Sequence, residues 1–353
     1  MSRFAIAALL LACEPDSGTV LSLPFDETFA LAGTIELAES PTDSIAQIGS
    51  FLERRAGGFL VSDARLPRLR GYSEDGSVEA AFGRFGDGPW EFREISAFAE
   101  TASGSVVVSS WRNPWLNYLT PALNPDTVLP VPDMAIFGLH AFAESLILQG
   151  VGTDVLATMG GREERGHLHR LVADSIAWRA WTSRIDDKPY WNGLGAGRPV
   201  AIAGDSVFIM ESLLYPATVL NGVGDSVGTI GYPSPSFRQI PEIPRGYFAN
   251  VQSGQRVETV LRSYDLVRRI DVVADDYLVF TVGRPDSTKA TFPFRMTDKV
   301  VEVYDRHSGE KLYGKVGLPE GSKVLGGGRY LYVLLDPDFP PWRIARYRLL
   351  PQD

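Results

Sequence analysis

Charged and aromatic side chains that could contact a ligand gather in one glycine-rich stretch near residue 90. The group combines three kinds of chemistry, namely cations, carboxylates and an indole: Arg84, Asp87, Trp90, Glu91 and Arg93. Arginine and tryptophan are enriched where proteins bind partners, so these residues are candidates for a ligand-binding loop. The same residues could instead be architectural, with Glu91 capping backbone amides of a turn and Trp90 packing between neighbouring sheets.

Two further aromatic groups carry the same two interpretations. Trp111, Arg112 and Asn113 follow the first group along the chain, and tryptophan with arginine suits a protein or carbohydrate surface. Trp191 lies in a glycine-rich loop that could cover a ligand site. Packing between sheets explains the tryptophans equally well, and the loop at Trp191 could simply connect two sheets.

The histidines suggest a metal site only weakly. His167 and His169 alternate along one expected strand, so both rings would point to the same face. Glu163 and Glu164 lie in the hairpin just before them, but two histidines without a third placed ligand are more typical of a solvated hairpin. We therefore predict no metal site. His140 falls in an expected inner strand, where its ring would either face a central channel or pack in the core.

Composition and motifs exclude several function classes. The net charge of -9 argues against nucleic-acid binding, which requires clustered Lys and Arg. The chain contains no phosphate-binding loop or metalloprotease motif, and it shows no helix period that could follow a strand to make a nucleophile elbow. The sequence therefore leaves catalytic residues unassigned without ruling out catalysis, and it predicts no bound cofactor apart from calcium under the alternative given below.

The N-terminus predicts an exported protein. Arg3 precedes an apolar run at residues 4–11, and the run ends before Cys13, the only cysteine. This segment resembles a bacterial lipoprotein signal, which implies cleavage before Cys13 and acylation of its thiol. An ordinary secretory signal with a chance cysteine is the alternative. The run is shorter than the roughly 20 residues that span a bilayer, so we expect the membrane to be reached by the lipid anchor only.

This resemblance also predicts the domain organisation and the location. Residues 1–12 would be the signal peptide, residues 13–28 a tether and residues 29–353 one folded domain. Glu14 stands where the lipoprotein family often has an aspartate that retains the protein in the inner membrane. The implied location is the cell envelope, as an outer-membrane lipoprotein that faces the periplasm or the surface.

From residue 29 onward the chain reads as short strands separated by clusters of Gly, Pro, Asp and Asn. An apolar strand recurs on the scale of a structural repeat in the forms FLVSD, SVVVS, SLILQ, SVFIM, YLVFTV and YLYVLL. We predict an all-β fold, a six-bladed β-propeller of four-stranded antiparallel blades. The last unit lacks one strand, so the ring would be closed by an N-terminal strand at residues 34–38. A pair of β-sandwiches is the alternative, which the absence of a mid-chain linker disfavours.

Two parts of the repeat pattern are irregular. The third unit contains an additional expected strand at residues 155–159, and its boundaries within residues 160–200 cannot be fixed. Residues 232–246 are rich in proline and are expected to form a long loop between the fourth and fifth blades, with the boundary open within residues 232–265.

The first blade carries a family resemblance. Residues 58–63 (GFLVSD), 68–72 (RLRGY), 75–77 (DGS) and 83–92 (GRFGDGPWEF) resemble the bacterial six-bladed propellers related to NHL repeats. Their exit motif usually reads Gly-x-x-Gly-x-Gly-Pro-Gly-Glu-Phe, and Trp90 replaces one glycine. Because bulky residues rarely adopt positive φ, we expect this turn to depart from the family's geometry. Many members of the family are exported or lipid-anchored.

The resemblance implies two function classes. One is a monomeric binding or scaffolding module at the cell envelope, for a protein, small-molecule or carbohydrate ligand. The alternative is a calcium-dependent hydrolase or lactonase, similar to gluconolactonase-like and strictosidine-synthase-like propellers that hold calcium with a Glu, Asn and Asp ring. No such ring can be placed here, because the acids fall mainly in expected turns: Asp75, Asp205, Asp225, Asp275 and Asp276. A third possibility is a structural ring without a ligand.

Overall fold

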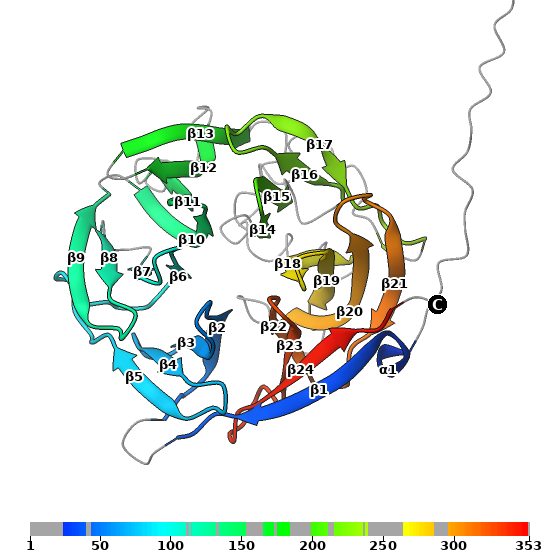
Figure 1. Cartoon of the computed structure of the whole chain (residues 1–353), viewed down its shortest axis with the longest axis horizontal. Coiled ribbons are helices and arrows are strands. Elements are labelled where there is room, and N and C mark those ends of the chain that lie inside the picture. Colours follow the sequence, from blue (N-terminus) through cyan, green and yellow to red (C-terminus); the bar gives the residue numbers. More distant parts are fainter. Residues whose placement is uncertain are drawn as a thin grey trace, which may run out of the picture.

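The described residues form six four-stranded antiparallel sheets arranged around one axis, which confirms the predicted six-bladed β-propeller (Figure 1). This computed structural model describes residues 24–39, 44–110, 113, 115–131, 134–152, 165–172, 175–183, 199–210, 215–235, 237–238, 264–285 and 296–351. Within these residues no helix is long and apolar enough to cross a membrane.

The first five blades each use four consecutive strands, from the innermost to the outermost. Blade 1 contains β2 (Ile48–Glu53), β3 (Phe59–Asp63), β4 (Leu69–Tyr72) and β5 (Val78–Phe82). Blade 2 contains β6 (Ala97–Glu100), β7 (Val106–Ser109), β8 (Trp115–Leu119) and β9 (Pro125–Pro130). Blade 3 contains β10 (Met134–Phe142), β11 (Ser145–Gly152), β12 (Arg165–Val172) and β13 (Ser175–Ser183). Blade 4 contains β14 (Val200–Ala203), β15 (Ser206–Met210), β16 (Ala217–Leu220) and β17 (Ser226–Ile230). Blade 5 contains β18 (Leu266–Val273), β19 (Tyr277–Pro285), β20 (Met296–Asp305) and β21 (Lys311–Gly317).

Blade 6 joins the two ends of the chain, as the sequence predicts. Its inner strands are β22 (Lys323–Gly326), β23 (Leu331–Leu335) and β24 (Arg343–Leu349), and its outermost strand is β1 (Phe29–Glu36). Ile35 pairs with Ile344 in this antiparallel ladder. The short helix α1 (Phe25–Thr28) precedes β1, within the segment expected to be a tether.

The second strands of the blades are mainly apolar and buried because neighbouring blades cover both of their faces. All five residues of β3 are buried, whereas four of the five residues of the outermost strand β17 are exposed. The core therefore lies between blades. Between blades 1 and 6, for example, the Phe51 ring lies 5.3 Å from that of Phe59 and 4.9 Å from that of Tyr332, measured between ring centroids.

A buried polar network holds the segment after blade 4 against blade 5. Glu302 on β20 accepts hydrogen bonds from the hydroxyls of Tyr215, at 2.6 Å, and Ser234. Its Oε2 also lies 3.0 Å from Nζ of Lys311 on β21, and both side chains of this ion pair are buried. A buried ion pair is stable only when hydrogen bonds satisfy its remaining polar atoms.

Aromatic rings complete the surroundings of the Lys311 ammonium. Nζ lies 4.3 Å from the ring centroid of Tyr232 and 5.2 Å from that of Tyr304, and it donates to the Tyr232 carbonyl at 2.6 Å. Burial lowers the pKa of Lys311, and the Glu302 carboxylate works in the opposite direction. The cluster is thus an internal ion pair inside a cage of tyrosines.

Some expectations lie outside the described residues. They are the signal peptide with Cys13, the strand at residues 155–159 and most of the loop at residues 232–246.

Candidate functional site

A cavity of about 850 Å³ lies along the propeller axis. Its described lining comes from the innermost part of all six blades, through β2, β6, β10, β14, β18 and β22 or the residues that adjoin them. The volume falls in the range of about 300 to 1,000 Å³ that is usual for small-molecule sites. The channel is therefore the candidate ligand site.

Cationic side chains gather in the channel wall although the whole chain is acidic. Five arginines and three carboxylates are among the described lining residues. The arginines are Arg54, Arg55, Arg268, Arg269 and Arg329, and the carboxylates belong to Glu53, Asp271 and Asp275. Glu100 and Glu74, which are not among the lining residues, pair with Arg54 and Arg329. The whole chain carries a net charge of -9. Cations concentrated in a concave, poorly solvated site attract anions.

Two of these arginines form ion pairs with lining carboxylates. Arg269 binds Asp271 on the same strand, with Nη2 to Oδ1 at 2.7 Å and Nε to Oδ2 at 3.1 Å. Arg329 pairs with Glu53 of blade 1, and it also contacts Glu74 at 2.7 Å. The Arg329 pairs join blade 6 to blade 1, whereas the Arg269 pair lies within β18.

Glu100, at the end of β6, positions the segment that follows β2. Its Oε1 accepts a hydrogen bond from Nε of Arg54 at 3.2 Å, and its Oε2 accepts one from the backbone N–H of Arg55 at 2.7 Å. Glu100 is buried, and so is most of the Arg54 side chain. The backbone at Arg55 is thereby fixed against blade 2.

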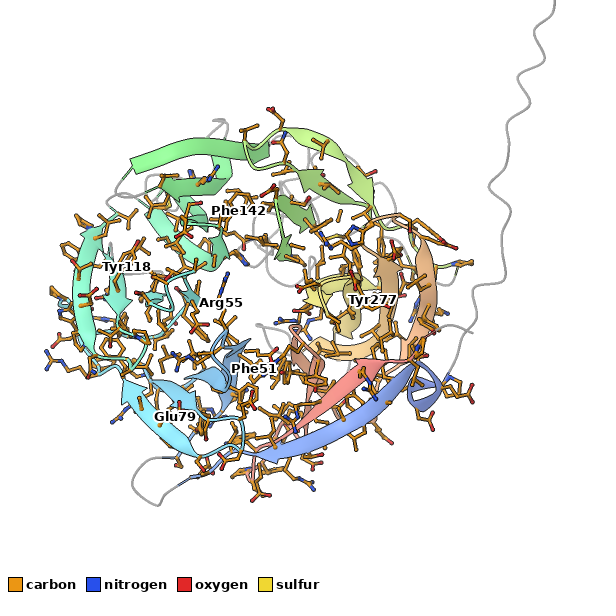
Figure 2. All side chains as sticks on the ribbon, viewed as in Figure 1. Phe51, Arg55, Glu79, Tyr118, Phe142 and Tyr277 are labelled. Carbon is orange, nitrogen blue, oxygen red and sulfur yellow. The ribbon has the colours of Figure 1, made fainter. Side chains whose placement is uncertain are left out.

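Arg55 itself is exposed to the channel. Figure 2 shows its side chain directed toward the axis of the ring. Within the described part of the chain, its guanidinium makes no hydrogen bond and no ion pair. A guanidinium presents five donors in a planar fork, so Arg55 is available to a carboxylate or a phosphate.

A second polar group of the channel is His140 on β10. Its Nε2 is buried and has no hydrogen-bond partner among the described residues. Burial lowers the pKa of His140 from 6.5 to about 4; the nearby Arg269 contributes to this shift, and Gln149 opposes it. The ring is therefore neutral at pH 7 and adds no charge to the channel.

Gly138 makes room for these polar groups. A Cβ atom at Gly138 would lie 2.6 Å from Oε1 of Gln149 and 3.2 Å from Nε2 of His140. The strand pairing shifts between Ile136 and Gly138, where β10 bulges against β11. Bulges of this kind are common next to binding sites because they redirect side chains.

The pKa of His140 leads to a first prediction. The unfolded chain binds the proton near pH 6.5 and the folded chain only near pH 4, so the unfolded state is favoured as the pH falls through this window. The free energy of unfolding should drop by up to about 3 kcal/mol on this account. Urea unfolding at pH 7 and pH 4.5 should show a smaller acid loss for His140→Gln than for the wild type. An equal loss in both proteins would contradict the prediction.

The loop predicted to bind a ligand is tied together by its own charges. Nε and Nη2 of Arg93 contact the two carboxylate oxygens of Asp87 at 2.7 and 2.6 Å, and Nη2 of Arg84 lies 3.0 Å from Oε1 of Glu91. Oε2 of Glu91 accepts the backbone N–H of Gly88 at 3.1 Å. None of these side chains is among the described residues that line the channel, and their role in binding stays a prediction.

Trp90 adopts the geometry that the sequence argued against. Its φ is 67°, so the expectation that the turn would depart from positive φ is wrong. The backbone N–H of Trp90 donates to Oδ1 of Asn117 at 3.0 Å, and its ring packs edge to face on Phe82. Asn113 is buried and donates to the Glu91 carbonyl at 2.8 Å. Contacts from blade 2 therefore stabilise the turn.

The remaining candidates are distributed as follows. His140 is the predicted site residue that lines the channel, whereas Trp111, Arg112 and Trp191 lie outside the described residues. His169 is buried in blade 3, and the side chain of its predicted neighbour His167 is likewise not described.

No metal site is visible within the described residues. They contain no group of three or more His, Cys, Asp or Glu that could hold an ion. The acids named from the sequence lie in turns between strands, as expected: Asp75, Asp205, Asp225, Asp275 and Asp276. The calcium-dependent alternative therefore gains no ligand set from the described residues.

Sequence reasoning missed the arginines of the channel. Arg54 and Arg55 directly follow β2, and Arg268 and Arg269 interrupt the apolar pattern of β18. Two adjacent cations beside or within an innermost strand are unusual, because that strand has little access to bulk water. Each of these two arginine pairs was a signal in the sequence that could have pointed to the channel.

The fold and the channel define the class of protein, a six-bladed β-propeller with an axial cavity. No known family profile matches the sequence, and no curated protein is similar to it. Among solved structures, an exported protein from Bacteroides fragilis aligns with a TM-score of 0.60 and 11% identity, over 94% of this chain and 98% of its own. Virginiamycin B lyase from Staphylococcus aureus aligns with a TM-score of 0.49 and 11% identity, over 91% and 100%. At these identities the similarity shows the fold alone.

Proposed function

We propose that the protein is an exported, lipid-anchored propeller of the cell envelope that binds a small ligand in its axial channel. One observation carries the proposal. The cavity of about 850 Å³ contains a guanidinium and an imidazole nitrogen, those of Arg55 and His140, that have no hydrogen-bond partner among the described residues. Polar groups that converge without partners in a concave site are typical of ligand sites.

The N-terminal sequence and the fold neighbour support the location. The apolar run before Cys13 resembles a lipoprotein signal, and the aligned protein from Bacteroides fragilis is described as exported. A propeller held at the membrane by one acyl-bearing residue would leave the channel accessible to solutes.

A ligand screen tests the proposal directly. Small sugars, organic acids and peptides would be screened for an increase in Tm, because a ligand that binds only the folded state stabilises it in proportion to ln(1 + [L]/Kd). At least one compound is expected to raise Tm in the wild type and to lose most of its effect in His140→Leu. If every stabilising compound acts equally on this variant, the channel is not the binding site.

The lipid anchor has its own test. In a bacterial host, the wild-type chain should incorporate an alkyne analogue of palmitate and sediment with membranes, and Cys13→Ser should abolish both, because Cys13 is the only cysteine. Soluble wild-type protein without label would contradict the anchor. The ligand proposal would be unaffected by that result.

A further inference from the structure

We propose that the channel recognises its ligand through a carboxylate and that the ligand class is a small monoanionic hydroxy acid, such as a uronic acid. This inference rests on the proposed function and specifies its ligand. It combines three observations, which are the arginines gathered in the channel, the unpaired guanidinium of Arg55 and the nature of the neutral groups nearby.

The first observation is that cations gather in the channel of an acidic protein. Five of its described lining residues are arginines and three are carboxylates, although the chain as a whole carries a net charge of -9. A guanidinium that is not neutralised in such a concave site attracts an anionic group of a ligand.

The second observation is that Arg55 is available, whereas other arginines of the wall are engaged. Arg54 is bound by Glu100, Arg269 by Asp271 and Arg329 by Glu53. Arg55 has its backbone fixed by Glu100, and its exposed side chain has no described partner. A fixed backbone with a free guanidinium fork suits bidentate binding of a carboxylate.

Asp275 restricts the charge of the ligand. Its carboxylate lines the same cavity, and it forms no ion pair with Arg55 or with any other described residue. A second acidic group on the ligand would meet this carboxylate, whereas a hydroxyl could donate to it. The wall therefore favours one negative charge together with hydroxyl groups.

The third observation concerns neutral groups. The His140 ring is uncharged at neutral pH because burial lowers its pKa to about 4, and Oε1 of Gln149 lies close to the same glycine, Gly138. Phe51 and Phe137 add aromatic surface to the cavity wall. Neutral hydrogen-bonding groups beside aromatic surface suit the hydroxyls and the C–H faces of a sugar ring.

Isothermal titration calorimetry with three probes of one ring type tests the inference. The three sugars share one ring type. Galacturonate carries a carboxylate, galactose is neutral and galactosamine carries an amine. Galacturonate should bind the wild type about ten- to a hundredfold more tightly than galactose, since a charge-assisted hydrogen bond contributes more than a neutral one. Galactosamine should bind more weakly than galactose.

Variants of Arg55 assign the effect to the channel. Arg55→Gln should reduce the preference for galacturonate over galactose to less than about threefold, and Arg55→Lys should retain part of it because the charge remains. Arg348→Gln is the matched control, since Arg348 is an exposed arginine on β24 without a described partner and outside the channel lining. The control should behave as the wild type does.

Three outcomes would overturn the inference. The first is equal affinity of the wild type for galacturonate and galactose, and the second is a preference for galacturonate that survives in Arg55→Gln. The third is the absence of galacturonate binding at a concentration of about 20 mM. After any of these results the channel could still bind another ligand as proposed above. The proposed function would fail only if the broader screen also gave no compound sensitive to His140→Leu.

Discussion

Replacing Glu302 with leucine is expected to lower the free energy of unfolding by about 3–5 kcal/mol, the usual cost of leaving one charge of a buried ion pair uncompensated. Lys311 would remain inside its tyrosine cage without a counter-charge, and the hydroxyls of Tyr215 and Ser234 would lose their acceptor. Chemical unfolding followed by circular dichroism would measure the loss.

A double variant separates the ion pair from general damage to blade 5. Glu302→Leu combined with Lys311→Met removes both charges, and it should be more stable than Glu302→Leu alone because no isolated charge stays buried. A loss below about 1 kcal/mol in the single variant, or a double variant that is less stable than the single one, would show that the pair is not the main interaction at this site.

Deleting residues 1–36 should have the second large effect, because it removes β1 from blade 6. Seven residue pairs join β1 to β24, and Phe29 and Ile35 are buried. Each buried side chain of this size contributes about 1.5–3 kcal/mol, so the loss should reach about 5 kcal/mol before any hydrogen bonds are counted. For a chain of 353 residues that corresponds to a drop in Tm of about 7 °C.

The matched control for this truncation is deletion of residues 1–23, which leaves α1 and β1 in place. Its Tm is expected to lie within about 2 °C of the Tm of the chain cleaved before Cys13. Thermal unfolding and size-exclusion chromatography would compare the two truncations. If both unfold at the same temperature, β1 does not close the ring in solution.

The fold could be predicted because its signal is repeated and local. Strands such as β3 are buried on both faces, so they appear in the sequence as short apolar runs bounded by turn residues. The last unit was one strand short, and residues 34–38 were an expected strand that belonged to none of the other units. The pairing of Ile35 with Ile344 confirms that reasoning, although β1 begins earlier, at Phe29.

The candidate site could be predicted only in part because it is assembled from many blades. His140 was identified because one histidine in an inner strand is conspicuous. Arg55 follows its strand in a segment that resembles an ordinary charged turn, and its exposure to the axis depends on Glu100 of the next blade. The positive φ of Trp90 likewise depends on Asn117, which lies 27 residues away in the chain. The arginine doublet marks a position in the sequence, but local sequence carries no signal for the contacts that orient Arg55 and Trp90.

The pairing of the first strand with the last hairpin has a consequence for the order of folding. During synthesis, β1 emerges early and has no partner until β24 has also emerged, because its ladder is formed with residues 343–349. The circle cannot be completed while those residues are still inside the ribosome. Closure of the propeller is therefore a late event, and until then the edge of β1 is open to pairing with other chains.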